Sequence, residues 1–256
     1  MSQITATFNK TIKGFLRNRA VLFWTIAWPI ILLIILSFTV LNNVPADIMP
    51  LAKGGVTVSM VFFALTLAGM SNLASDIARD RESGLLAKLK SMPISPARDF
   101  LGRILALIIF ALIAVALVTA TGLAIGARFN ISIESLQAVG FLLLAICASA
   151  GVGLIIGSLG KTAQGVVFTG VGISVVAAFL SGLFISYSSL PDVLKAFGRI
   201  YPVSSAGAST TYLLLGEAVA GYNPFTAGQL ITMVALSLAF LGAGIFLYSR
   251  MSWKKD

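Results

Sequence analysis

Six runs of apolar residues, each long enough to cross a bilayer, dominate this chain of 256 residues. A transmembrane helix needs about 20 such residues. None of the six runs contains Asp, Glu, Lys, Arg or His. Only 11% of the whole chain is charged, whereas a soluble domain carries about 25%. We therefore predict an all-α membrane protein, a single transmembrane domain over 1–256, with spans at 20–41, 56–74, 104–127, 138–159, 165–185 and 227–248.

Lysine and arginine gather in one set of connections. Most of them lie in the N-terminal segment, in the connection 75–103, at Lys161 and in the C-terminal tail. The alternate connections hold only Lys53, Arg128, Lys195 and Arg199. Positively charged connections stay on the cytoplasmic side of a membrane. We predict a multi-pass protein of the cell membrane with both termini in the cytoplasm.

The residue types that carry most enzyme chemistry are missing. The chain has no histidine, the usual proton shuttle, and its single cysteine, Cys147, lies inside an apolar run. The uncharged spans offer no proton relay and no buried carboxylate pair. Gly160-Lys161-Thr162 looks like the end of a phosphate-binding loop, but Ile155 occupies the place of its first glycine. We expect no catalytic, metal or cofactor site, no ATPase and no nucleic-acid binding in this chain.

The first 19 residues form an amphipathic pattern. The apolar face, at helical spacing, consists of Ile4, Phe8, Ile12 and Phe15, and the opposite face carries Lys10, Lys13 and Arg17. A helix of this kind lies in the headgroup layer of a membrane. Two roles fit the pattern: a topological anchor, or a lever that contacts a partner.

The connection 186–226 is apolar but broken by prolines. Pro191 and Pro202 separate short helix-like pieces, and Tyr201 precedes the second proline. Irregular backbone at membrane depth is tolerated only where protein or a water-filled cavity covers it. We expect re-entrant or interfacial helices before the last span, which serve either as a structural lid or as an external gate at Pro191, Tyr201 and Pro202.

A few side chains inside the spans are candidates for a translocation path, namely Trp28, Thr66, Asn72, Ser174 and Ser181. Hydrogen bonding and packing within the membrane explain the same residues equally well.

The connection 75–103 mixes carboxylates with cations, which topology alone does not require. Gly84 predicts a bend between an extension of the second span and a short helix that carries Leu85 and Leu89. Pro93 ends this helix, and Ser95 opens the next one as its N-cap. The pattern indicates a helix-bend-helix that binds a partner at the membrane surface.

These residues carry a resemblance to a known family. The series Arg81-Glu82-x-Gly84-Leu85, Leu89, Pro93-Ile94-Ser95 and Gly102-Arg103 resembles the cytoplasmic signature of the membrane subunits of ABC-2 type exporters. The amphipathic start, the six spans and the proline-broken connection extend the resemblance over most of the chain. It is closer to the drug-export type than to the polysaccharide-export type.

The resemblance implies that the connection 75–103 contains a coupling helix, seated on a separate ATPase subunit that binds ATP and Mg²⁺. The coupling residues would be Arg81, Glu82, Gly84, Leu85, Leu89 and Pro93. It also implies a second permease copy or a homologous permease, with substrate moving outward between the two. The uncharged spans favour a lipophilic or amphipathic cargo. The alternative is a non-enzymatic membrane scaffold or partner-gated channel whose loop binds a different soluble protein.

Overall fold

The computed structural model describes residues 3–39, 41, 44–91, 95–130, 132–185 and 187–252. Over these ranges the backbone forms helices, turns and loops, and no strand. Six helices are long and apolar enough to cross a membrane, which confirms the predicted number. They run over Arg19–Thr39, Met49–Glu82, Pro96–Ala124, Gln137–Leu159, Ala163–Leu180 and Ala227–Arg250.

Three of these spans join several helical pieces without a break. The first consists of α2 (Arg19–Leu22), the π-helical turn η1 (Phe23–Ala27) and α3 (Trp28–Thr39). The second consists of α4 (Met49–Leu67), the π-helical turn η3 (Ala68–Leu73) and α5 (Ala74–Glu82). The last consists of α13 (Ala227–Leu247) and the start of the π-helical turn η6 (Tyr248–Ser252). Such turns interrupt the α-helical hydrogen-bond ladder, and they are frequent at functional sites.

The second and third spans reach further than their apolar runs. The second begins at Met49 and ends at Glu82, beyond both ends of the run at 56–74. The third, α7 (Pro96–Ala124), begins before the run at 104–127 and includes the charged residues Arg98, Asp99 and Arg103. Most of the connection 75–103 is therefore helix. The helices continue through charged residues because Asp76, Asp80, Asp99 and Arg103 are buried and paired with one another.

The second span lies at the centre of the bundle, where every residue from 60 to 78 is buried. It packs against α8 (Gln137–Leu159) and α9 (Ala163–Leu180). On α8, a Cβ added to Gly153 would overlap the carbonyl oxygen of Gly69 in η3. Glycine at this position therefore lets the two backbones approach closely, as small residues do where membrane helices pack together.

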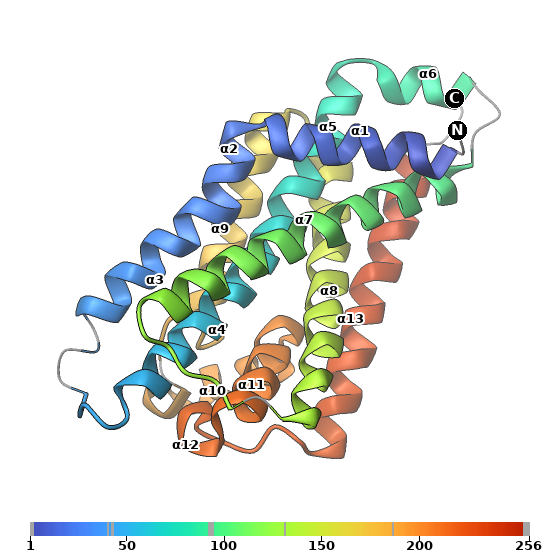
Figure 1. The fold of residues 1–256 in the computed structure, drawn as a ribbon. Helices are drawn as coiled ribbons and strands as arrows, with labels where there is room; N and C mark the ends of the chain where they lie inside the picture. Colours follow the sequence, from blue (N-terminus) through green and yellow to red (C-terminus); the bar gives the residue numbers. More distant parts are fainter. Residues whose placement is uncertain are drawn as a thin grey trace.

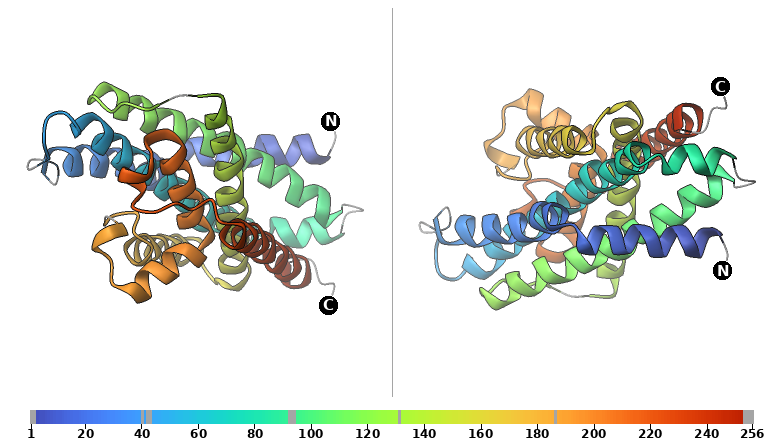
Figure 2. Two further views of the ribbon diagram at one scale, coloured as in Figure 1. Left: turned by 90° about the horizontal axis from the view of Figure 1, so that it is seen from below. Right: turned by 90° about the horizontal axis from the view of Figure 1, so that it is seen from above.

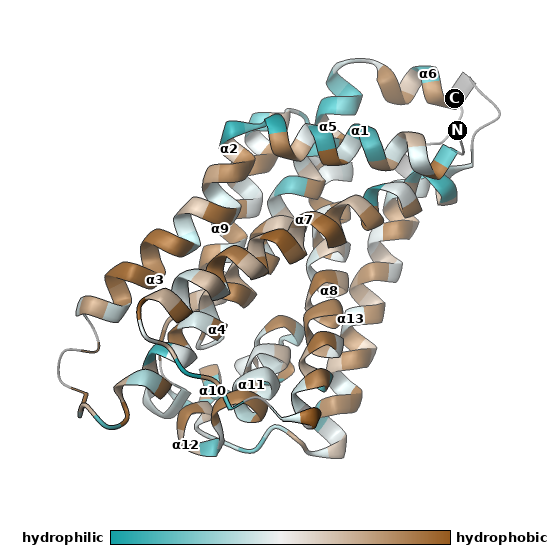
Figure 3. Ribbon diagram, viewed as in Figure 1, coloured by the Kyte–Doolittle hydropathy of each residue, from teal (hydrophilic) through white to brown (hydrophobic). Residues whose placement is uncertain are grey.

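The bundle has two distinct ends (Figure 1). Helices α1 (Gln3–Arg17) and α6 (Leu85–Ser91) lie at one end, together with the start of the chain and the end of α13. The other end is formed by η5 (Tyr187–Ser189), α10 (Asp192–Ile200), α11 (Pro202–Leu215) and α12 (Glu217–Ala220), and η4 (Ile133–Leu136) precedes α8 there. Figure 2 shows α1 lying against α7. Hydrophilic residues mark α1 and α5, whereas α3 and α7 are mainly hydrophobic (Figure 3).

Candidate functional site

The end of α5 and the short helix α6 form the outermost segment at the α1 end of the bundle (Figure 1). Gly84 makes the bend between them with a φ of 70°, a left-handed conformation that costs glycine no steric penalty. In α6, Leu86 is buried and Leu89 packs against the core, whereas Lys88 is exposed. Leu85 is half-buried, so Leu86 is the residue that anchors this helix most firmly.

The connection from α6 to α7 includes Pro93, the predicted end of the short helix, which lies outside the described residues. Ser95 occupies the N-cap of α7 as predicted, but its side chain makes no capping hydrogen bond. Its backbone is instead bound by Gln3 of α1, whose amide nitrogen donates to the Ser95 carbonyl at 3.0 Å. The start of α7 is therefore attached to the N-terminal helix.

Arg81 caps the end of α8. Its guanidinium donates hydrogen bonds to the carbonyl oxygens of Gly160 at 2.6 Å, Ser158 at 2.9 Å and Gly157 at 3.1 Å. The last carbonyls of a helix have no partner within the helix, and they carry its negative dipole end. The Arg81 guanidinium supplies these carbonyls with hydrogen-bond donors and places a positive charge at the negative end of the helix dipole.

Glu82 caps the beginning of α9. Its carboxylate accepts a hydrogen bond from the backbone N–H of Ala163, the first residue of α9, at 3.0 Å. Free N–H groups and the positive dipole end are found at this end of a helix, which suits a carboxylate. Two neighbouring side chains of opposite charge thus hold the α8–α9 turn to the end of α5, directly before the bend at Gly84.

A second group of charged residues is buried beneath α1. Arg103 on α7 is 1% exposed and pairs with Asp76 and Asp80 of α5 and with Asp99 of its own helix. The Asp99 contact is 2.8 Å long. Tyr248 adds a 2.6 Å hydrogen bond, donated by its hydroxyl to Asp99. We call Asp76, Asp80, Asp99 and Arg103 the buried ion cluster.

Helix α1 is attached to this cluster through its polar face. Thr7 donates to Asp99 at 3.1 Å, Thr11 donates to Asp76 at 3.2 Å, and Lys10 pairs with Asp76 and Asp80. Sequence reasoning missed the cluster. The available signal was the spacing of four residues between Asp76 and Asp80 and between Asp99 and Arg103, which places each pair on one helix face.

The apolar face of α1 packs on protein. Phe15 is 2% exposed, and its ring lies 5.3 Å from that of Phe110 on α7. Ile4, Phe8 and Ile12 are half-buried. Phe15 and Ile12 therefore pack on the core, whereas Ile4 and Phe8 remain partly exposed.

Comparison with known proteins identifies the family. The sequence profile of the ABC-2 type transporters matches residues 2–215. The chain belongs to the ABC-2 type transporter family. It is similar to proteins of Mycobacterium tuberculosis described as "Probable doxorubicin resistance ABC transporter permease protein DrrC", from strains CDC 1551 / Oshkosh and ATCC 25618 / H37Rv. Each is 28% identical over 222 residues, which cover 86% of this chain and 79% of the relative.

The chain is therefore the membrane subunit, or permease, of an ABC transporter, and the ATPase lies in a separate subunit. This confirms the resemblance found in the sequence. The segment that carried the resemblance, Arg81 to Gly84, is the same segment that holds the α8–α9 turn and bends into α6.

Most of the proposed translocation residues are bonded inside the permease. Thr66 donates to a carbonyl of its own helix at 2.8 Å, Ser174 does the same at 2.7 Å, and the Asn72 amide donates to Thr25 at 2.6 Å. All three are buried. Trp28 packs edge-to-face with another tryptophan of the first span. Ser181 lines the cavity of about 570 Å³ that is described below.

The three predicted gate residues mark helix boundaries. Pro191 is the N-cap of α10, Tyr201 ends α10 and caps α11, and Pro202 begins α11. The Tyr201 ring stacks on Phe197 with centroids 5.6 Å apart. Burial raises the pKa of Tyr201 well above its usual range, so its hydroxyl stays neutral. Helix α11 packs against α4 and α8.

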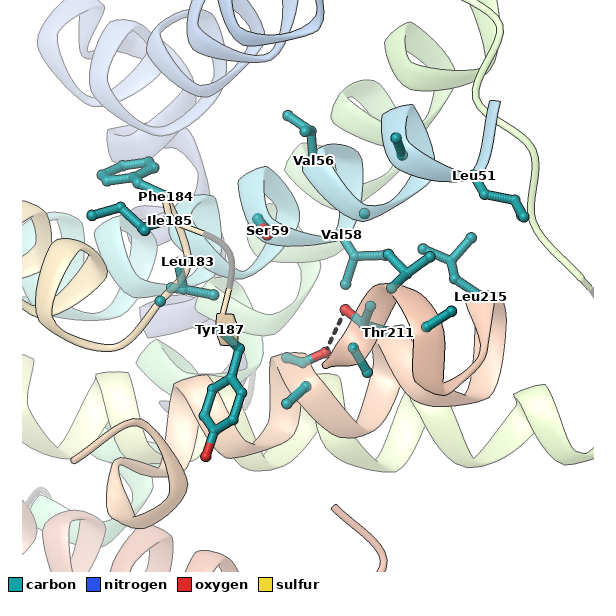
Figure 4. A pocket seen from close by; sticks show the side chains of 18 of the residues that line it. Leu51, Val56, Val58, Ser59, Leu183, Phe184, Ile185, Tyr187, Thr211 and Leu215 are labelled. Carbon is teal, nitrogen blue, oxygen red and sulfur yellow. Dashed lines mark hydrogen bonds between the residues drawn. The ribbon is translucent and has the colours of Figure 1, made fainter. Parts of the chain in front are cut away.

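A cavity of about 570 Å³ lies at this end of the permease (Figure 4). Its walls come from the end of α3, the beginning of α4, the segment after α9, and from α11 and α12. None of the described residues that line it carries a charge. Its volume is in the range of small-molecule sites, which is about 300–1,000 Å³.

Proposed function

We propose that this permease moves a lipophilic or amphipathic substrate outward, driven by ATP hydrolysis on a separate nucleotide-binding subunit that docks on the segment 79–95. The observation that carries the proposal is the geometry around Gly84. Helix α6 lies outermost, and Arg81 and Glu82 join it to the ends of three long helices. A force applied to α6 therefore reaches α5, α8 and α9 together.

Glu82 has two tasks in this proposal. One carboxylate oxygen accepts the Ala163 N–H, while the side chain remains exposed to a docked subunit. Glu82→Lys would place a cation at the positive end of α9 and reverse the charge at the docking surface. We expect this variant to lose ATPase activity that depends on the permease, because the turn and the docking surface are altered together.

The test uses the permease co-expressed with its ATPase subunit and purified as a complex. Association is measured by the ATPase retained on the tagged permease, and coupling by substrate-stimulated ATP hydrolysis in liposomes. Glu217→Lys is the matched control, since Glu217 is an exposed carboxylate at the opposite end of the bundle. A Glu82→Lys complex that associates and hydrolyses ATP like the Glu217→Lys complex would refute the proposal.

We also propose that the α1 and α6 end faces the cytoplasm, with both termini on that side of the cell membrane and α1 at the headgroup layer. Support comes from the lysines and arginines of the N-terminal segment and of the segment 75–103, which lie at this end. In a Cys147→Ser background, we expect an impermeant maleimide to label Asn223→Cys in intact cells and to leave Ser83→Cys unlabelled. The reverse labelling would invert the topology.

The other proposed partners are a second permease copy, or a homologous permease, and membrane lipid. Large apolar side chains are exposed on several spans, among them Ile109, Leu117, Phe168, Val176 and Leu238. Such surfaces need lipid or another subunit around them. The doxorubicin resistance named for the Mycobacterium tuberculosis relatives supports a lipophilic or amphipathic cargo.

A further inference from the structure

The cavity at the α11 end offers fewer free polar groups than its residue types suggest. Ser59, Ser181, Ser204 and Thr211 line it, and the last three donate their hydroxyl hydrogen to a backbone carbonyl, at 3.4, 2.6 and 2.9 Å. The remaining wall is largely aliphatic, with residues such as Val58 and Leu183. A polar ligand would lose its water there and gain few hydrogen bonds in return. The cavity suits a hydrocarbon or aromatic body.

A second, polar hollow of about 310 Å³ adjoins it, and the two share Tyr222. Polar side chains supply much of its wall: Arg199, Asn223, Thr226, Gln229 and Thr232. An apolar space and a polar space that meet at one residue match the two parts of an amphipathic molecule.

Two tyrosines form the boundary between the hollows. The rings of Tyr187 and Tyr222 lie 4.2 Å apart, and both line the apolar cavity. In Figure 4 the Tyr187 ring leads away from the cavity. Its hydroxyl accepts a 2.6 Å hydrogen bond from Arg199, and the Tyr222 hydroxyl accepts one of 2.9 Å from Gln229. The rings are thus fixed with their polar ends on the side of the polar hollow.

Arg199 sets the charge that the polar hollow favours. Its guanidinium carbon lies 4.9 Å from the centre of the Tyr222 ring. Within the described residues it forms no salt bridge, whereas Lys195 on the same helix pairs with Asp192. One N–H is used by Tyr187, which leaves the rest of the guanidinium fork for a carboxylate or phosphate. A cationic head at this place would be repelled.

We propose that the two hollows bind one anionic amphiphile, with its apolar body in the cavity between α4 and α11 and its acid group beside Arg199. The proposal deepens the export function and rests on it only for the conclusion that the bound molecule is cargo. Binding itself requires no ATPase.

The experiment uses the purified full-length permease in nanodiscs of phosphatidylcholine. Three photoreactive probes share one hydrocarbon chain and differ in the head group, which is a carboxylate, an alcohol or a primary amine. Crosslinks are mapped by mass spectrometry. We expect them in segments 181–185 and 204–211, with the carboxylate probe labelling about fivefold more than the alcohol, the size expected of one exposed ion pair, and the amine least.

Arg199→Gln should reduce carboxylate labelling to the level of the alcohol and leave the alcohol unchanged. Lys195→Gln, the matched control on α10, should keep the carboxylate preference. Ala208→Trp fills the cavity and should abolish labelling by all three probes. If phosphatidylglycerol added to the disc competes, the ligand is a bilayer lipid; if only free acid competes, it is a soluble amphiphile. Either result supports an acidic head.

Equal labelling by the three head groups, a carboxylate preference that survives Arg199→Gln, or crosslinks confined to residues that line neither hollow would each overturn the proposal. Because Arg199 is exposed, its replacement leaves the core intact and the test does not depend on the Ala208 variant folding. If the probes do not bind as expected, the proposal of ATP-driven export is unaffected. If the ATPase does not dock on the permease, a positive result for probe binding remains valid.

Discussion

Replacing Arg103 with methionine should destabilise the permease strongly. The arginine is 1% exposed and pairs with all three carboxylates of the buried ion cluster. Methionine keeps much of its length but leaves Asp76, Asp80 and Asp99 with little compensation, because Lys10 reaches only two of them from a side chain that is 37% exposed. Removing one partner of a buried ion pair costs about 3–5 kcal/mol.

This free energy converts into a thermal shift. For a chain of this size 1 kcal/mol lowers Tm by about 2–4 °C, so we expect a decrease of about 6–20 °C. Fluorescence-detected unfolding of the purified permease in detergent measures it. Arg98→Met removes an exposed arginine from the same end of α7 and should shift Tm by no more than about 2 °C.

A combined variant separates lost packing from unpaired charge. Asp76→Asn and Asp80→Asn, added to Arg103→Met, remove two of the three negative charges that lose Arg103 and that Lys10 compensates only weakly, so part of the lost stability should return. The reasoning is refuted if Arg103→Met unfolds at the same temperature as Arg98→Met. It is also refuted if the two asparagines lower Tm further.

Three other substitutions test the attachments between helices. Arg81→Gln removes three hydrogen bonds to α8, and amide exchange in the α8–α9 turn should rise about tenfold, whereas Arg79→Gln, at an exposed site, should not change it. Gly102→Leu would bring a Cβ within 2.8 Å of a backbone oxygen of α1, so trypsin should cleave α1 faster than in the parent. Gly84→Ala forces alanine into a left-handed conformation at about 1–2 kcal/mol, and should lower Tm; Gly140→Ala, which meets open space on α8, should not. Unchanged amide exchange, unchanged trypsin cleavage or an unchanged Tm would contradict the role given to Arg81, Gly102 or Gly84, respectively.

The number of spans could be predicted because the requirement is local. A helix in hydrocarbon needs its own apolar length, whatever its neighbours do. The bend at Gly84 and the helix that begins after Ser95 followed from single residues for the same reason. The ends of the spans could not be predicted from the sequence, because they depend on whether a charged residue forms an ion pair with a residue of another helix.

The buried ion cluster shows where sequence reasoning stops. Asp76 and Asp80 lie among exposed cations along the chain, so the pattern indicated a docking surface. Their partner Arg103 is 27 and 23 residues away and belongs to another helix. Arg81 and Glu82 were identified as functional, but their contacts with α8 and α9 depend on a turn about 80 residues later. The cavity beside Tyr222 depends on the packing of several elements that are far apart in the sequence, which no local pattern specifies.

The unbroken second span has a mechanical consequence. Its 34 residues run from the bend at Gly84 to the wall of the cavity, where Val56, Val58 and Ser59 lie. At 1.5 Å per residue the length is about 50 Å, and Val56 is about 20 Å from the π-helical turn η3. A tilt of about 10° around η3 would move Val56 by about 3–4 Å, close to the width of a methyl group. A displacement of α6 at one end of the bundle would therefore change the shape of the cavity at the other end through a single helix.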